Sequence, residues 1–147
     1  MAETMAGPLV RPIAIVRHPI YSMLLPVPVV CFIGALLADI TYLESGGNLI
    51  WLSFASWFLF FGLLFGALAA LILLIDLFRS PGLRRGTGLA HLLLFYLALF
   101  VELWNILVHE RDGWTAVMGL GLTLSIVGVV LILIAGWLRR PAMEVVA

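Results

Sequence analysis

The sequence predicts an all-α membrane protein, a polytopic four-helix transmembrane bundle, on three observations. Of its 147 residues, 64% are hydrophobic and only 11% are charged, whereas ordinary soluble domains are roughly 25% charged. Four apolar runs cover residues 19–41, 49–78, 89–109 and 115–138. Each run reaches the roughly 20 residues that a helix needs to cross about 30 Å of hydrocarbon. We therefore expect a single transmembrane domain over residues 1–147, and we exclude a soluble catalytic domain, a nucleotide-binding fold and a nucleic-acid-binding module.

The first two runs each carry a local signal for how the helix is built. Pro26 and Pro28 remove two backbone donors from the first run, which should kink or interrupt its helix. The second run is about 45 Å long by helix rise, so it must tilt or project from the bilayer. Its small residues Gly62, Gly66 and Ala70 repeat every four positions. That repeat predicts a packing seam at which another helix approaches closely.

The remaining two runs differ in polarity. The third follows a loop rich in Ser, Pro and Gly, and it contains most of the ionisable residues that fall within the four runs. The fourth contains no charged residue and repeats small residues at Gly121, Ser125 and Gly128. We expect these three positions to form a second packing seam.

All eight basic residues of the chain are arginine, and their positions predict the topology. Seven of them lie before the first run, between the second and third runs, or after the fourth, and only Arg111 lies elsewhere. Positive residues gather in the cytoplasmic loops of membrane proteins. The count therefore predicts that both termini and the 79–88 loop are cytoplasmic. We expect the lipid bilayer to be the immediate partner of the arginines, and we expect no nucleic acid.

One face of the third run is polar along its length. His91, Glu102, Asn105 and His109 are separated by combinations of three- and four-residue steps, which place side chains on the same side of a helix. Ionisable groups in hydrocarbon are costly unless they face the bundle interior or a polar partner. We therefore expect this polar stripe to point at other helices, with Glu102 either close to a donor or protonated. Asp39 ends a similar face on the first run.

A pair of histidines predicts a cofactor. His18 and His91 stand at the starts of the first and third runs, which cross the membrane in the same direction, so both should lie at the inner level. Asp39 and His109 should share the outer level for the same reason. Two neutral imidazoles that face each other across a bundle can ligate a haem iron from both sides. His18 and His91 thus predict a b-type haem and a redox-associated membrane subunit that works near electron transfer, and a hydrogen-bonded or headgroup-binding role for the two histidines is the alternative.

Two other functions stay open. The stripe that includes Asp39, Glu102, Asn105 and His109 is also typical of a proton or small-solute pathway. The glycine seams equally suit a non-catalytic scaffold or accessory subunit of a larger membrane complex. We do not expect an enzyme, because the sequence has no His-Glu-x-x-His, nucleophile-elbow or phosphate-loop motif. Its one cysteine, Cys31, cannot build a metal cluster.

The start of the first run resembles a known family. His18-Pro19, Met23-Leu24, the prolines at positions 26 and 28 and the later Asp39 are similar to a motif of the bacterial membrane family called domain of unknown function 2231. His91 matches a further histidine of that family, whereas Tyr21-Ser22 stands where the family usually has a second His-Pro.

The resemblance covers residues 17 to 138 and implies four helices without an established activity. Some relatives are joined to iron–sulfur or cytochrome modules, which implies a redox setting by association. The resemblance further implies the bacterial inner membrane as the location. Other membrane or redox subunits, or further copies of the chain, are the partners that it implies.

Overall fold

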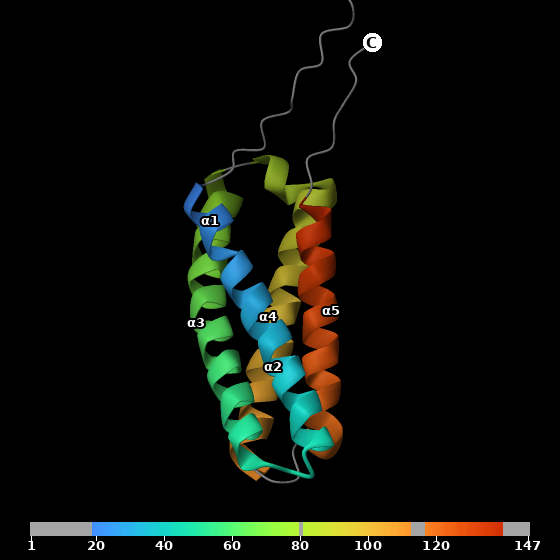
Figure 1. Ribbon diagram of the computed structural model, residues 1–147. Coiled ribbons are helices and arrows are strands. Elements are labelled where there is room, and N and C mark those ends of the chain that lie inside the picture. The colour runs from blue at the N-terminus through green and yellow to red at the C-terminus, as the bar shows by residue number, and fades with distance from the viewer. Residues whose placement is uncertain (1–18, 80, 113–116, 140–147) are drawn as a thin grey trace, which may run out of the picture.

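A computed structural model describes residues 19–79, 81–112 and 117–139, and these ranges form a bundle of helices without a strand (Figure 1). The first apolar run is divided into α1 (Pro19–Leu24) and α2 (Pro26–Glu44). The other long helices are α3 (Leu49–Arg79), α4 (Gly86–Asp112) and α5 (Leu122–Leu138). A short 3-10 helix, η1 (Pro81–Arg84), joins α3 to α4, and a π-helical turn, η2 (Val117–Gly121), leads into α5.

Four segments of the described chain are long and apolar enough to cross a membrane, which confirms the four-helix transmembrane prediction. They are Ile20–Glu44, Leu49–Arg79, Gly86–Arg111 and Gly119–Leu138. The third begins three residues before the predicted run, at Gly86, whose φ of 57° turns the chain between η1 and α4. The long second run forms one continuous helix of 31 residues, so α3 spans the whole height of the bundle.

The prolines of the first run interrupt its helix where the sequence predicts. Helix α1 ends at Leu24 and α2 begins at Pro26, because neither Pro26 nor Pro28 has an amide hydrogen to continue the ladder. The amide of Leu25 still donates to the carbonyl oxygen of Tyr21 at 3.0 Å. The two helices therefore act as one span that changes direction at the prolines.

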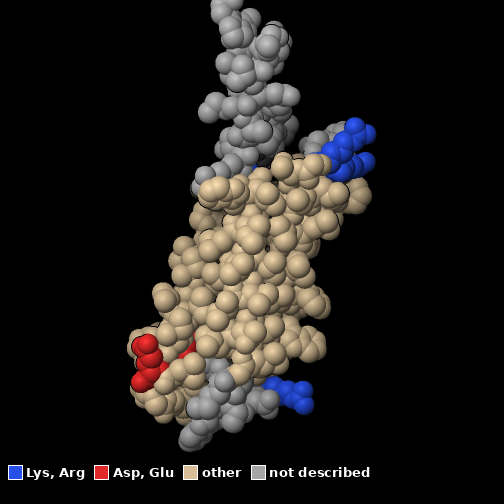
Figure 2. All heavy atoms as spheres, turned by 90° about the vertical axis from the view of Figure 1, so that its right-hand side faces the viewer, with Lys and Arg blue, Asp and Glu red and all other residues tan. Residues whose placement is uncertain are grey.

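The two ends of the bundle differ in what lies there. The start of α1, η1 and the end of α5 share one end, which we call the η1 end (Figure 1). The turn between α2 and α3, residues 45–48, lies at the opposite end, which we call the turn end. On the face seen in Figure 2, charged side chains of the described residues lie near these two ends, and an uncharged surface separates them. Such a band suits the hydrocarbon of a bilayer.

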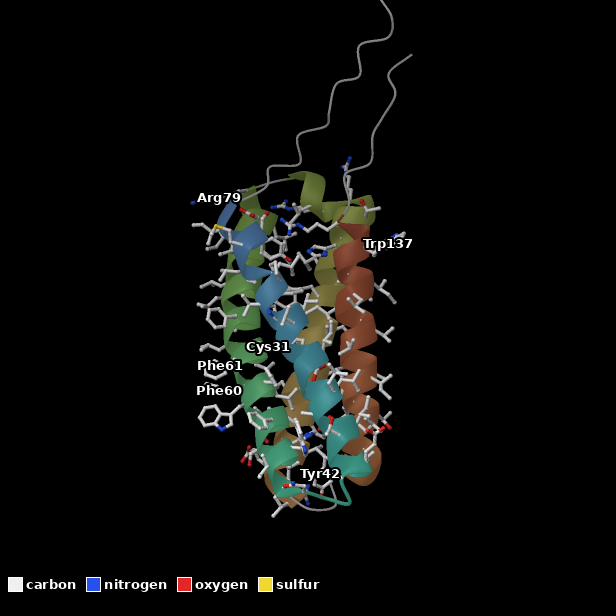
Figure 3. The ribbon with its side chains drawn as sticks, viewed as in Figure 1. Cys31, Tyr42, Phe60, Phe61, Arg79 and Trp137 are labelled. Carbon is white, nitrogen blue, oxygen red and sulfur yellow. The ribbon has the colours of Figure 1, made fainter. Side chains whose placement is uncertain are left out.

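Large aromatic and aliphatic side chains occupy both the inside and the outside of the bundle. Phe60 and Phe61 point outward from α3, and Trp137 points outward from α5 (Figure 3). An exposed apolar surface of this extent is expected for helices that face lipid tails. The centre of the bundle is an apolar layer of side chains with no exposed surface: Phe32, Leu59, Phe95, Ala98 and Ile132.

The small residues of the second run face two different neighbours. A Cβ atom at Gly62 would strike the ring of Phe32, on α2. A Cβ atom at Gly66 would lie 2.5 Å from Cδ2 of Leu99, on α4. The structure thus places this seam at two helix contacts. All six predicted seam positions are buried, namely Gly62, Gly66, Ala70, Gly121, Ser125 and Gly128.

Candidate functional site

A cluster of polar side chains lies inside the bundle near the turn end, between α2, α4 and α5. Asp39 comes from α2, Glu102, Asn105 and His109 come from α4, and Ser125 comes from α5. Four of these side chains have no exposed surface, and His109 is 3% exposed. The spacing of the polar stripe explains the placement, because steps of three and four residues keep the α4 members on one helix face. We call these five residues the buried network.

Hydrogen bonds join the buried network without a gap. The amide Nδ2 of Asn105 donates to Oε2 of Glu102 at 3.0 Å and to Oγ of Ser125 at 2.8 Å. The hydroxyl of Ser125 donates to Oδ2 of Asp39 at 2.5 Å. Oδ1 of Asp39 lies 2.9 Å from Nε2 of His109. These hydrogen bonds connect the mid-span carboxyl group of Glu102 to the carboxyl group of Asp39 and then to the imidazole of His109.

The two ring nitrogens of His109 fix how many protons this end of the network holds. Nδ1 lies 3.0 Å from the backbone carbonyl oxygen of Asn105, which can only accept, so Nδ1 carries a hydrogen. The 2.9 Å contact between Nε2 and Asp39 then needs one further proton. Whether that proton resides on the ring or on the carboxyl group, the Asp39–His109 pair has no net charge.

Glu102 is the network member whose charge has no counterpart. Its Oε2 accepts from Asn105, but Oε1 has no hydrogen-bond partner among the described residues. Oδ1 of Asn105 likewise has no hydrogen-bond partner among the described residues. The Asp39–His109 pair is already neutral, so an ionised Glu102 would leave one uncompensated negative charge inside the bundle. Burying such a charge is expensive, and a proton on Glu102 removes the cost.

Gly128 makes the room that Glu102 occupies. A Cβ atom at this position of α5 would overlap Oε1 of Glu102 and would lie 2.5 Å from its Cδ. The carboxyl group therefore rests against the bare backbone of α5. The seam predicted at Gly121, Ser125 and Gly128 therefore has two roles. Its small residues let a neighbouring helix pack closely, and they leave space for polar atoms.

A second polar cluster lies near the η1 end and centres on His91. The hydroxyl of Tyr21 lies 2.8 Å from Nε2 of His91, and Nδ1 of His91 lies 2.8 Å from the carbonyl oxygen of Ala135. The guanidinium of Arg139 lies 4.5 Å above the centre of the Tyr21 ring and donates to Oγ of Ser22 at 2.7 Å. A neutral His91 satisfies both contacts, with its hydrogen on Nδ1.

Of the predicted haem pair, only His91 lies within the described residues. His18 lies outside the described residues, so its distance to His91 is not defined. His91 has no ring nitrogen left for iron, because Nε2 faces the Tyr21 hydroxyl and Nδ1 faces the Ala135 carbonyl. Ligation would require His91 to give up one of these hydrogen bonds. The arrangement of His91 therefore does not fit a haem, and the cofactor stays a prediction from the sequence.

The polar stripe of the third run is interrupted between its two clusters. His91 and Glu102 are eleven residues apart, about 16 Å by helix rise. Phe95 and Ala98 lie between them on the same face, within the apolar layer. This layer separates the buried network from the polar cluster at His91. Polar groups therefore reach from the turn end to mid-span, and the apolar layer follows.

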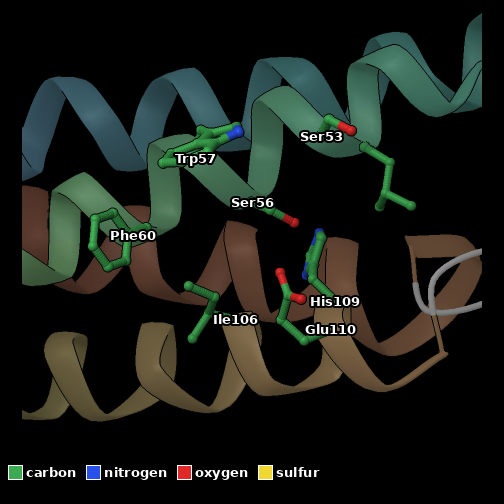
Figure 4. Close-up of a pocket in the computed structure, with 8 residues that line it drawn as sticks. Ser53, Ser56, Trp57, Phe60, Ile106, His109 and Glu110 are labelled. Carbon is green, nitrogen blue, oxygen red and sulfur yellow. The ribbon is translucent and has the colours of Figure 1, made fainter.

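An open pocket adjoins the buried network at the turn end. It holds about 680 Å³ between α3 and α4, and His109 forms part of its wall. Figure 4 shows the hydroxyl of Ser56, the ring of His109 and the carboxylate of Glu110 facing the same space. Because His109 belongs both to this wall and to the network, the pocket adjoins the network at this side chain.

Ser125 and Arg139 are among the contributors to these clusters that were not predicted as polar partners. Ser125 was expected only as a small residue of the packing seam, although its hydroxyl bonds both Asn105 and Asp39. Arg139 was used only for topology, although it packs on Tyr21. For Ser125 a signal was present, since a hydroxyl on a buried seam opposite a polar stripe is well placed to bond that stripe.

Comparison with known proteins identifies a family and nothing more specific. The family model described as "Predicted membrane protein (DUF2231)" matches residues 17–140. No curated protein and no solved structure matches the chain. The match covers all four candidate spans and both polar clusters.

Proposed function

The chain belongs to the DUF2231 family of predicted membrane proteins, and we propose that it binds and exchanges protons within the buried network, as the outer half of a proton pathway. The other half is closed by the apolar layer in this conformation. The proposal develops the proton-pathway alternative for the stripe of Asp39, Glu102, Asn105 and His109.

One observation carries the proposal: two buried carboxyl groups share a hydrogen-bonded network with a single imidazole. The imidazole of His109 neutralises Asp39, and no described residue does the same for Glu102. A carboxyl group held in this way is stable when it carries a proton, and its ionisation changes the charge of the whole cluster. A purely structural polar contact has no need of the second carboxyl group.

The members of the network have different parts in proton exchange. His109 can exchange a proton with Asp39 through Nε2, and exchange with the pocket requires Nδ1 to leave the carbonyl oxygen of Asn105. The hydroxyl of Ser125 accepts from one neighbour while it donates to the next. The side-chain amide of Asn105 only donates hydrogen bonds within the buried network. It therefore holds Glu102 and Ser125 in place without passing a proton between them.

We also propose the orientation and location that the arginines indicate. Arg79, Arg84 and Arg139 lie at the η1 end, and Arg111 lies at the turn end. The positive-inside rule then favours cytoplasmic termini in the bacterial inner membrane. In that orientation the pocket and the buried network open to the outer face, where a proton gradient across the membrane would deliver protons.

The redox role and the accessory role remain predictions from sequence. A b-type haem between His18 and His91 would need His91 to release Tyr21 or Ala135. An absorption spectrum of the purified protein tests this directly, because a haem-bearing protein shows a Soret band that His91→Ala removes. A scaffold or accessory subunit is tested by whether a larger subunit is purified with the chain in a fixed ratio.

Side-specific proton uptake tests the proposed function. Oriented proteoliposomes are first equilibrated at alkaline pH, so that Glu102 starts ionised, and then receive an acid pulse on the side of the turn end, while pH-sensitive dyes follow the medium and the lumen. We expect uptake from the medium that falls by about one proton per chain in Glu102→Gln, and no acidification of the lumen, because of the apolar layer. Uptake by Glu102→Gln that equals that of the unaltered protein would contradict the proposal.

A matched control comes from the opposite end of the bundle. Asp76 is a buried carboxyl group near the end of α3, on the side of η1. The change Asp76→Asn removes a buried acid without touching the buried network. Uptake from the turn end should therefore be unchanged in this variant. The pair of variants separates loss of the network from loss of any buried acid.

A further inference from the structure

We propose that the pocket between α3 and α4 at the turn end binds an amphipathic organic cation, that is, one ammonium-type charge carried on an apolar body. This inference goes beyond proton exchange and does not depend on it. It rests on the size of the pocket, on its unbalanced charge and on its aromatic wall, all of which are features of the pocket itself.

The pocket has the size of a small-molecule site. Its volume is about 680 Å³, and ligand sites in proteins commonly enclose roughly 300–1,000 Å³. Helix α3 forms one wall and α4 forms the other (Figure 4). Most of the lining is apolar, with a few polar groups that can orient a ligand, as such sites require. The lining residues are Leu52, Ser53, Ser56, Trp57, Phe60, Ile106, His109 and Glu110.

The charge of the pocket is negative and unbalanced. The side chain of Glu110 is exposed in the pocket, and no ion pair joins it to a cation among the residues that the structure describes. The neighbouring His109 is not a counterion for Glu110, because its Nε2 is already bonded to Asp39. A ligand that brings one positive charge would balance Glu110, and the hydroxyl of Ser56 faces the same space.

Aromatic rings line the same pocket as this carboxylate. Trp57 is 60% exposed and Phe60 is 47% exposed, so both rings offer surface to a ligand. Trp57 stacks on Phe61 at 5.9 Å and meets Phe60 edge-on at 6.1 Å, which holds its ring in place. Aromatic faces attract cations, and tryptophan does so most strongly. A carboxylate and a tryptophan in one pocket favour an organic cation over a neutral amphiphile.

A second pocket between the same two helices shows what a site for lipid tails looks like. It holds about 640 Å³ and is lined by Leu63, Ala67, Tyr96, Leu97, Leu99, Phe100 and Leu103. No charged residue lines it, so any acyl chain fills it without selectivity. The two pockets are alike in volume and in the helices that form them. Glu110 and the tryptophan therefore distinguish the turn-end pocket, and they are what the proposed ligand would recognise.

Binding of tetraphenylphosphonium to the detergent-solubilised protein tests the inference, with tetraphenylborate as a probe of the same shape and opposite charge. Isothermal titration against empty micelles corrects for partition into detergent. We expect saturable binding of the cation and no saturable binding of the anion. Glu110→Gln should weaken the cation about ten-fold or more, and Trp57→Leu should weaken it by a smaller factor. Equal binding of both probes would overturn the proposal.

The exposed Glu44, at the same end but outside the pocket, supplies the matched control. Glu44→Gln should bind the cation as the unaltered protein does, and equal losses in Glu44→Gln and Glu110→Gln would overturn the proposal by showing a general surface-charge effect. A lipid headgroup with an ammonium group shares the chemistry of the probe. Nanodiscs with phosphatidylethanolamine, compared with phosphatidylglycerol alone, separate the sources. If phosphatidylethanolamine weakens binding of tetraphenylphosphonium, the pocket binds a lipid headgroup. If binding is the same in both kinds of nanodisc, the pocket binds a free amphipathic cation.

Discussion

Replacing Gly128 by alanine should destabilise the bundle through one side chain on another helix. The added Cβ atom would overlap Oε1 of Glu102 and would lie 2.5 Å from Cδ and 2.9 Å from Cγ of the same residue. Glu102 has no exposed surface and is held by Asn105 at 3.0 Å, so it cannot swing into solvent. The carboxyl group must therefore move within a packed interior and give up its hydrogen bond.

The size of this effect follows from three contributions. Overpacking of an interior costs about 1–3 kcal/mol, and a buried hydrogen bond that is lost without replacement costs about 1–3 kcal/mol. Alanine in place of glycine favours the helix by about 1 kcal/mol. The two costs together exceed the gain, so we expect Gly128→Ala to lower the free energy of unfolding by about 3 kcal/mol, the middle of a range of about 1–5 kcal/mol.

A double-mutant cycle in detergent measures whether Glu102 is the cause. The cost of Gly128→Ala should fall below about 0.5 kcal/mol in a Glu102→Ala background, because the clashing carboxyl group is gone. Gly136, on the same helix, has no atom within 4 Å of an added Cβ. Gly136→Ala should therefore be neutral or stabilising. A Gly128→Ala cost that is absent, or that survives in the Glu102→Ala background, would refute the close contact between these residues.

Four further changes test the packing and the polar contacts, each measured as the free energy of unfolding in detergent. Gly62→Ala should cost more than Gly66→Ala, because a Phe32 ring yields less readily than the flexible end of Leu99; equal costs would argue against the contact at Gly62. His109→Ala should cost about 3 kcal/mol, because it leaves the Asp39 carboxylate buried without its partner. Asp39→Asn should cost less than about 1 kcal/mol, because the amide can donate to the imidazole and accept from Ser125; a large cost would mean that the ion pair itself stabilises the bundle.

The sequence was sufficient for the spans, and its helical spacing predicted an inward face for the stripe on the third run. Charged and polar groups in hydrocarbon are so costly that their helical spacing predicts which side of a span faces inward. The common level of Asp39 and His109 followed from the direction of two spans, and these residues lie 2.9 Å apart in the structure. Likewise, the absence of an amide hydrogen at Pro26 predicted the interruption of the first helix.

The partners of the polar residues were harder to predict, because they depend on how helices are rotated and shifted against each other. The carbonyl oxygen of Ala135 occupies Nδ1 of His91, and no pattern of side chains reveals a backbone atom. Ser125 was recognised by its size, whereas its hydroxyl became a partner only because α5 packs with that face toward Asp39. Position along a span can be predicted from sequence, but the pairing of spans requires the packed bundle.

The most direct test of a proton-holding network is the infrared spectrum of the protein in lipid at neutral pH. A protonated carboxylic acid has a C=O stretching band apart from that of a carboxylate, and deuterium oxide shifts it once the proton exchanges. We predict such a band in the unaltered protein and in the exposed control Glu44→Gln, and a loss of intensity equal to one carboxylic acid in Glu102→Gln, because Glu102 has no described residue to neutralise its charge. A spectrum without this band, or a band of unchanged intensity in Glu102→Gln, would contradict a proton on Glu102 and with it the proposed function.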